Sequence, residues 1–176
     1  MQRWRVPLGF ACGALFLFFA KPTLELLLIG AVVALPGLTL RAWASGHLRK
    51  NESLATSGPY ALTRNPLYLG SFLIGVGFTI AAGRWLLAIV PIVMLLGIYL
   101  PVMRVESATL TQLFGKKYER YSREVPLFLP RLSPYRSAVT PTRFDRDLYF
   151  RYREYRAALG LVIAWALLAL KIIYFK

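Results

Sequence analysis

The sequence contains very little of what metalloenzymes and disulfide-stabilised domains require. Its 176 residues include one cysteine, Cys12, and one histidine, His47. A single cysteine permits no internal disulfide and no CxxC zinc or redox pair. A single histidine excludes a histidine-rich metal site and makes a Ser-His-Asp triad a poor candidate. We therefore expect no bound metal.

Charged residues are also scarce, and most of them are basic. They make up 17% of the chain and hydrophobic residues 57%, whereas soluble domains average roughly 25% and 45–50%. The net charge of +14 would by itself suggest nucleic acid as a partner. Because the apolar residues form long blocks, we attribute the basic excess to loops that lie against anionic lipid headgroups. We expect membrane lipids, and no nucleic acid, as partners.

The apolar blocks predict an all-α integral membrane protein, with about five transmembrane helices and cytoplasmic amphipathic helices in a single domain. A spanning helix needs ~20 residues, with a range of ~17–25. The first block is short enough to be read as a signal peptide, but bulky Phe18 and the following Lys21-Pro22 make a poor cleavage site, so we expect a retained helix. The expected spans are about 6–20, 23–44, 67–83, 85–103 and 158–175.

The distribution of lysine and arginine predicts the orientation of these spans. The turns after the first and third spans carry one basic residue each, Lys21 and Arg84, whereas residues 104–157 alone carry twelve. Basic residues collect on the cytoplasmic side of membrane proteins. We therefore expect a cytoplasmic N-terminus, a C-terminus on the opposite side, and cytoplasmic segments at 45–66 and 104–157.

The loop that enters the third span reads SGPYALTRNPLYLG, residues 57–70. Asn65 before Pro66 suits the start of a helix, with the asparagine side chain as N-cap. Arg64 would then stand beside free backbone N–H groups, where an anion is favoured. Tyr60 and Tyr68 add aromatic faces for stacking. Gly70, Gly75 and Gly77 serve either close helix packing or room for a ligand.

The segment after the fourth span has one carboxylate at a notable place. Glu106, Leu110, Phe114, Tyr118 and Tyr121 form one stripe of an amphipathic helix, unless Gly115 breaks it. Glu106 then lies just past the membrane and needs a partner: either an arginine such as Arg64 or Arg104, or a cationic or hydroxyl-rich ligand. Residues 125–130 follow as an extended apolar strap, and residues 142–156 as an interfacial anchoring helix.

Together these two segments resemble the isoprenylcysteine carboxyl methyltransferase-like family, integral-membrane enzymes that use S-adenosylmethionine and are related to the phospholipid N-methyltransferases. The resemblance covers roughly residues 36–130. Two positions depart from the family pattern: Asn65 replaces the histidine of its RHP motif, and Ser107 replaces the second glutamate of a pair. The matching residues are Gly58, Pro59, Tyr60, Arg64, Pro66, Tyr68, Gly70, Glu106, Leu110, Phe114, Gly115, Tyr118, Tyr121, Val125 and Pro126.

The resemblance implies an S-adenosyl-L-methionine site built from segments 45–70 and 104–130, and a lipophilic small molecule or lipid as methyl acceptor. Arg64 would hold the carboxylate of the methionine moiety, the tyrosines would frame the adenosine, and Glu106 would hold its ribose or amino group. The resemblance assigns catalysis to Arg64, Asn65 and Glu106. It assigns cofactor binding to His47, Gly58, Pro59, Tyr60, Arg64, Asn65, Tyr68, Gly70, Glu106 and Tyr118.

Two other functions stay open at the level of sequence. Sterol-reductase-type proteins resemble this family in their C-terminal half, so a membrane reductase that uses NADPH is one alternative. A membrane anchor or scaffold without activity is the other, because Asn65 cannot accept a proton near neutral pH and Ser107 removes a negative charge. The acceptor atom, whether carboxylate, amine or thiol, is also open.

Overall fold

The computed structural model describes residues 13, 16–49, 52–136 and 142–174, and this part of the chain is all-α. The main helices are α2 (Leu24–Ser45), α3 (Pro66–Ala81), α4 (Ile89–Met94), α5 (Leu100–Phe114), α6 (Lys116–Glu124), α7 (Arg146–Arg151) and α8 (Tyr155–Tyr174). Short 3-10 helices cover Gly58–Ala61 and Trp85–Ala88, and a π-helical segment, Leu95–Tyr99, joins α4 to α5.

Three continuous helices are long and apolar enough to cross a membrane: Leu24–Ser45, Trp85–Phe114 and Tyr155–Tyr174. The apolar helix α3, Pro66–Ala81, is shorter. The chain is therefore a multi-pass membrane protein, and four of the five expected spans correspond to observed helices. Of the first, 6–20, most residues lie outside the described part, and residues 16–19 are helical.

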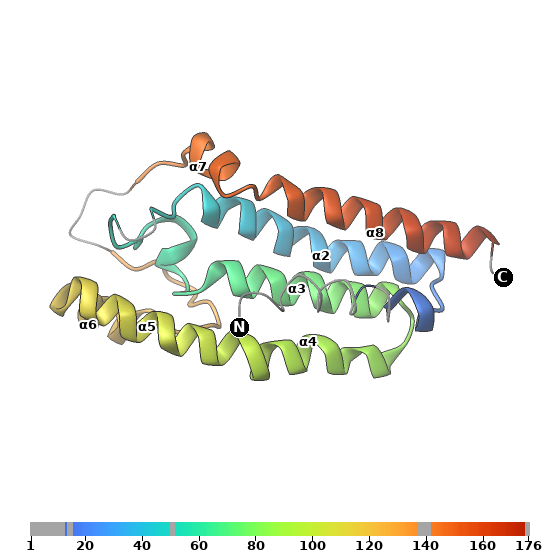
Figure 1. The fold of residues 1–176 in the computed structure, drawn as a ribbon, viewed down its shortest axis with the longest axis horizontal. Helices are drawn as coiled ribbons and strands as arrows, with labels where there is room; N and C mark the ends of the chain where they lie inside the picture. Colours follow the sequence, from blue (N-terminus) through green and yellow to red (C-terminus); the bar gives the residue numbers. More distant parts are fainter. Residues whose placement is uncertain (1–12, 14–15, 50–51, 137–141, 175–176) are drawn as a thin grey trace.

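Helix α2 lies between α3 and α8, and α4 lies beside α3 (Figure 1). The α2–α3 interface is made by paired glycines. A Cβ added at Gly77 would stand 2.6 Å from the carbonyl oxygen of Gly30, and one added at Gly70 would stand 2.5 Å from that of Gly37. Real Cβ atoms do not approach so closely, so the two backbones touch. Close helix packing is thus the role of Gly70 and Gly77.

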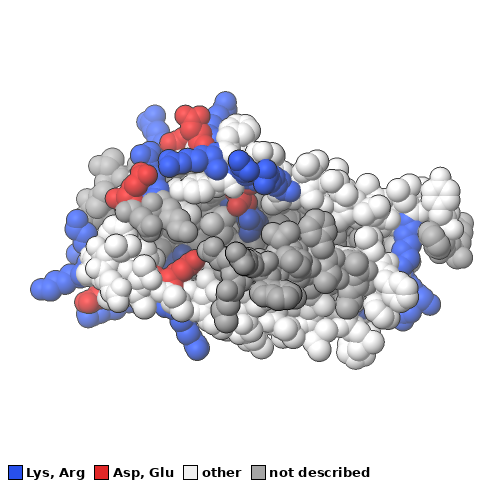
Figure 2. Space-filling model, viewed as in Figure 1, with Lys and Arg blue, Asp and Glu red and all other residues white. Residues whose placement is uncertain are grey.

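The polar segments gather at one end of the helices, called here the polar end, which comprises residues 46–65, α6 and α7. On the visible face most charged side chains gather toward this end, and a smaller group of Lys and Arg lies at the opposite end (Figure 2). At the opposite end the chain turns tightly, with the Lys21 N–H donating to the Ala82 carbonyl at 2.8 Å. There Lys171 donates to the carbonyls of Leu17 and Phe18.

The expected stripe from Glu106 to Tyr121 does not lie on one helix. The helix that begins at Trp85 continues to Phe114, and Gly115 then takes a positive φ of 51°. Because glycine has no Cβ, it adopts this conformation readily, so α5 ends at Phe114 and α6 begins at Lys116. The fourth span and the first part of the amphipathic segment are therefore one helix, and Tyr118 reaches Ser107 from a second one.

Candidate functional site

The strap predicted at 125–130 folds back along the loop that enters α3. The Arg64 N–H donates to the Pro126 carbonyl at 2.9 Å, and the Thr63 hydroxyl donates to the Phe128 carbonyl at 2.9 Å. Farther along, the Arg131 N–H donates to the Leu62 carbonyl, also at 2.9 Å. The two segments of the family motif, far apart in sequence, are thus held together mainly by bonds to backbone carbonyls.

Asn65 occupies the N-cap position of α3, but its side chain does not cap the helix. Its amide nitrogen Nδ2 instead donates to the Leu127 carbonyl at 2.9 Å. The expectation that Asn65 accepts from a first-turn N–H is therefore wrong. The Leu127 carbonyl of the strap lies within hydrogen-bond distance of Asn65, and the side-chain amide of Asn65 bonds to this carbonyl instead of capping the helix. The N–H groups in the first turn of α3 receive no side-chain cap from this residue.

Arg64 lies at the centre of this arrangement. One terminal nitrogen donates to the Tyr118 hydroxyl at 3.2 Å, and that hydroxyl donates to Oγ of Ser107 at 2.8 Å. The Nε atom of Arg64 is buried and has no hydrogen-bond partner. Within the described residues no carboxylate forms an ion pair with Arg64. A guanidinium with a buried, unsatisfied donor favours an anion.

Glu106 is exposed on α5 and accepts a hydrogen bond from the Tyr68 hydroxyl at 3.1 Å. The ring of Tyr68 also packs against Tyr99, with 5.2 Å between centroids. Of the partners considered from sequence, no described ion pair joins Glu106 to Arg64 or Arg104. The carboxylate therefore stands at the site with a tyrosine as its hydrogen-bond donor.

Two tyrosines stabilise the base of the site. Tyr60 and Tyr121 are both buried, and the Tyr121 hydroxyl donates to the Tyr60 carbonyl at 2.7 Å. Burial, and then the negative charge of Glu106, raise the pKa of Tyr60 above its ordinary value. Burial raises the pKa of Tyr121 as well. Both phenols therefore remain protonated at neutral pH.

His47, Gly58 and Pro59 form the back of the loop. The His47 ring is buried between Trp43 and Phe144, and its Nδ1 lies 2.9 Å from the Trp43 carbonyl. A Cβ at Gly58 would stand 2.7 Å from this ring, and Gly58 has a positive φ of 60°. Pro59 is fully buried beside it. These residues shape the turn that presents Tyr60 and Arg64.

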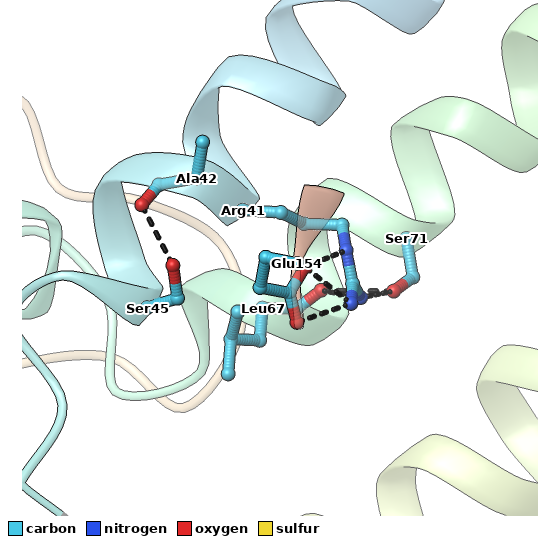
Figure 3. Close-up of polar contacts among 6 residues, drawn as sticks. All are labelled: Arg41, Ala42, Ser45, Leu67, Ser71 and Glu154. Carbon is cyan, nitrogen blue, oxygen red and sulfur yellow. Dashed lines mark hydrogen bonds and ion pairs between the residues drawn. The ribbon is translucent and has the colours of Figure 1, made fainter. Parts of the chain in front are cut away.

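Sequence reasoning missed an ion pair next to Gly70. Arg41 lies inside α2 and forms a bidentate pair with Glu154 at 2.8–2.9 Å. It also donates to the Ser71 hydroxyl and to the Leu67 carbonyl (Figure 3). A charge within an apolar helix requires a partner, and this rule could have identified Arg41.

An apolar cavity of about 330 Å³, called here the inner cavity, lies between α3, α4 and α8. Its lining includes Ser71 in the first half of α3, next to the polar end, Tyr99 before α5, and Leu168 in the second half of α8. Since Tyr99 contacts Tyr68, the inner cavity adjoins the Tyr68–Glu106 pair. A second hollow of about 280 Å³, the side cavity, lies between α2, α3 and α8 and is lined in part by Arg41.

The described residues contain no cluster of three or more His, Cys, Asp or Glu side chains that could hold a metal ion. Apart from His47, Gly58 and Pro59 at the back of the loop, the residues that the sequence assigned to the site fall into two groups. Arg64, Asn65, Tyr68, Glu106, Tyr118 and Tyr60 surround the start of α3, whereas Gly70 packs against α2. Ser107 joins the first group through the Tyr118 hydroxyl, and Tyr99 joins it through the ring of Tyr68.

Comparisons with known proteins identify relatives of this chain. The cobalt-zinc-cadmium resistance protein CzcN of Cupriavidus metallidurans is 32% identical over 151 residues, which are 79% of this chain and 67% of the relative. The nickel-cobalt-cadmium resistance protein NccN of Alcaligenes xylosoxydans xylosoxydans is 33% identical over 115 residues, 64% of this chain and 52% of the relative.

The protein-S-isoprenylcysteine O-methyltransferase of Schizosaccharomyces pombe is 25% identical over 127 residues, 69% of this chain. The chain spans only about half the length of this relative and of NccN. No solved structure matches. Residues 26–117, which contain α2, α3 and the motif residues from Tyr60 to Glu106, match the family described as phospholipid methyltransferase, and the chain belongs to this family.

Proposed function

We propose that this protein is a membrane methyltransferase that uses S-adenosyl-L-methionine and transfers a methyl group to a lipophilic acceptor. The observation that carries the proposal is the buried Nε of Arg64, which has no partner at the start of α3. Two features support it: the first turn of α3 beside this guanidinium, which has no side-chain cap, and the apolar inner cavity, which adjoins the Tyr68–Glu106 pair.

The residues present fit this cofactor. Its carboxylate requires an anion site, and Arg64 together with the N-terminus of α3 offers one. Its ribose hydroxyls and amino group require acceptors, and the Glu106 carboxylate offers one at the surface of the site. The buried phenol of Tyr60 is protonated and offers a neutral aromatic face, and Tyr68 of α3 adds a second ring beside Glu106. When bound, the sulfonium supplies an activated methyl group.

The protein itself has little chemistry to perform in such a transfer. It must align donor and acceptor and exclude water. Tyr118 and Ser107 hold the Arg64 side chain, and the strap holds the backbone of Arg64 and Asn65. The inner cavity would receive the apolar part of the acceptor. The head group of the acceptor would then lie near Tyr99 and Glu106. None of the site residues needs to act as a strong base.

Calorimetric titration of detergent-purified protein with S-adenosylmethionine, S-adenosylhomocysteine and NADPH tests the proposal. We expect both methionine-derived ligands to bind and NADPH to be silent. Arg64→Ala should weaken binding by about 10–100-fold, since a charge-assisted hydrogen bond contributes roughly 1.5–3 kcal/mol. Glu106→Gln should weaken it less, because the amide retains one acceptor oxygen.

Arg120→Ala is the matched control, because Arg120 is an exposed arginine of α6 that pairs only loosely with Glu124. Its affinity should equal that of the unmodified protein. Binding of NADPH in place of the methionine-derived ligands would replace the proposal with a reductase. Equal affinities for Arg64→Ala and Arg120→Ala would remove Arg64 from the site.

The names of CzcN and NccN suggest a cellular setting for this activity. We propose that methylation of a membrane component by this protein raises the tolerance of its host to divalent metals. Growth of a metal-sensitive strain on cobalt, zinc or cadmium should improve with the unmodified protein and not with Arg64→Ala. Equal growth with the unmodified protein and with Arg64→Ala would show that metal tolerance does not depend on methyl transfer.

A further inference from the structure

Gly160 of α8 lies where the two cavities adjoin. The inner cavity and the side cavity share four lining residues: Ser71, Ile74 and Phe78 on α3, and Gly160 on α8. The other α8 residues that line the inner cavity, Ala164 and Leu168, follow Gly160 at helical spacing. One face of α8 therefore forms a wall of the cavity.

Close packing does not account for this glycine. In transmembrane helices small residues usually allow two backbones to approach, as Gly30 and Gly77 do here. A Cβ added at Gly160, however, would find no heavy atom within 4 Å. Glycine in a helix is also about 1 kcal/mol less favourable than alanine. The position therefore gives up some helix stability and keeps the space beside it open.

Helix α8 lies outside residues 26–117, the part of the chain that matches the family. Three contacts fix it to the matched part: the Arg41–Glu154 ion pair next to its start, the Trp165 indole N–H donating to the Leu27 carbonyl at 3.3 Å, and the packing of Trp165 on Phe78. Phe78 itself lines both cavities. The α8 wall of the cavity is thus fixed in place, although α8 lies outside the residues that match the family.

We infer that Gly160 is a specificity-determining residue: it keeps the inner cavity wide enough for the hydrocarbon chain of the methyl acceptor. The lining of the cavity is almost entirely apolar, and the helices around it are apolar enough to span a membrane. A cavity of this size is typical of a small-molecule site. The occupant is therefore a single apolar chain of a membrane amphiphile, with its polar head toward Ser71 and Tyr99.

The inference rests on the proposed function in one respect: it identifies the bound amphiphile as the methyl acceptor. Binding of the amphiphile and affinity for the cofactor are therefore measured separately. Palmitate and hexadecylamine, each with a photoactivatable diazirine at the chain end, are cross-linked to the protein in lipid nanodiscs. Mass spectrometry then locates the labelled residues. We expect label on α8 and α3 residues of the inner cavity, and we expect unlabelled amphiphile to compete with it.

Gly160→Leu fills the open space without a backbone clash and should reduce this labelling about tenfold or more. Gly160→Ala should give an intermediate value. Gly97→Leu is the control, because Gly97 also has no heavy atom within 4 Å of its added Cβ but lines neither cavity. It should label like the unmodified protein. S-adenosylhomocysteine affinity and helical content should be the same in all four proteins.

Unreduced labelling in Gly160→Leu, or equal reduction in Gly160→Leu and Gly97→Leu, would overturn the role of Gly160 and leave the proposed function intact. If labelling falls in the Gly160 variants as expected but none of the four proteins binds S-adenosylhomocysteine, the cavity assignment stands and the methyltransferase proposal fails. The ratio of palmitate to hexadecylamine labelling also measures whether an anionic or a cationic head is preferred at the polar end.

Discussion

The side chain of Asn65 donates from Nδ2 to the backbone carbonyl of Leu127 at 2.9 Å, across 62 positions of sequence. This bond joins the loop that enters α3 to the strap that follows α6. It stands next to the backbone bond from Arg64 to Pro126. The asparagine at the position of the family histidine is thus a tether between the two halves of the candidate site.

Asn65→Asp removes this donor and places a carboxylate against a carbonyl. We expect a loss of roughly 1–3 kcal/mol in the free energy of unfolding, the cost of an unsatisfied buried polar group. Denaturation of the purified protein monitored by circular dichroism measures it. Gln112→Glu, an equivalent change at an exposed position of α5, should be neutral. If the two substitutions cost the same, the tether contributes nothing to stability.

The Arg41–Glu154 pair should show strong coupling between its members. Both side chains are largely buried, with exposures of 22% and 13%, so removing either one leaves a poorly solvated charge. We expect Arg41→Leu and Glu154→Leu each to destabilise by roughly 1–3 kcal/mol, less than the value for fully buried pairs. The double variant should cost less than the two single changes added together. Additive costs in this double-mutant cycle would contradict a direct interaction.

The backbone contact between α2 and α3 predicts which glycine tolerates a methyl group. Gly77→Ala should destabilise by about 1–3 kcal/mol, because its Cβ would overlap the Gly30 carbonyl and the helices must separate. Gly97→Ala, with open space at its Cβ, should be neutral or slightly stabilising. Thermal denaturation of both variants in one detergent gives the comparison. A neutral Gly77→Ala would show that the helices can separate without cost.

The raised pKa values of Tyr60 and Tyr121 predict alkaline instability. Their ordinary pKa is about 10, and burial raises both in the folded state. Unfolded chains therefore release these protons first, so stability is complete below about pH 10 and falls as the pH rises toward the raised values. Tyrosinate absorbance during alkaline titration should show two late-ionising groups in the folded protein.

Tyr121→Phe tests the contribution of Tyr121 to this alkaline instability. It removes one late-ionising group and the bond to the Tyr60 carbonyl, so we expect lower stability at neutral pH and a shallower loss above pH 10. Tyr155→Phe is the control, since Tyr155 is exposed. An unchanged alkaline slope in Tyr121→Phe would show that Tyr121 ionises normally.

Much of the candidate site could be predicted from the sequence because its residues lie in two short motifs. Arg64, Tyr68, Glu106 and Tyr118 do meet at the start of α3. For Gly70 and Gly115 the sequence left two alternatives open, and for Asn65 it favoured the wrong one. A side-chain amide can cap its own helix or bond to a distant carbonyl, and only the position of Leu127 decides between the two.

The sequence by itself determined four of the spans, their polar end and the all-helical architecture of the described residues. Apolar runs of sufficient length have one stable place, the bilayer, and every backbone group within them must bond inside its own helix. Only the tertiary structure decided that Gly115 divides the amphipathic segment, that Arg41 pairs with Glu154 across 113 positions, and that α8 walls a cavity. These features depend on contacts between segments far apart in the chain, which periodicity along one helix does not encode.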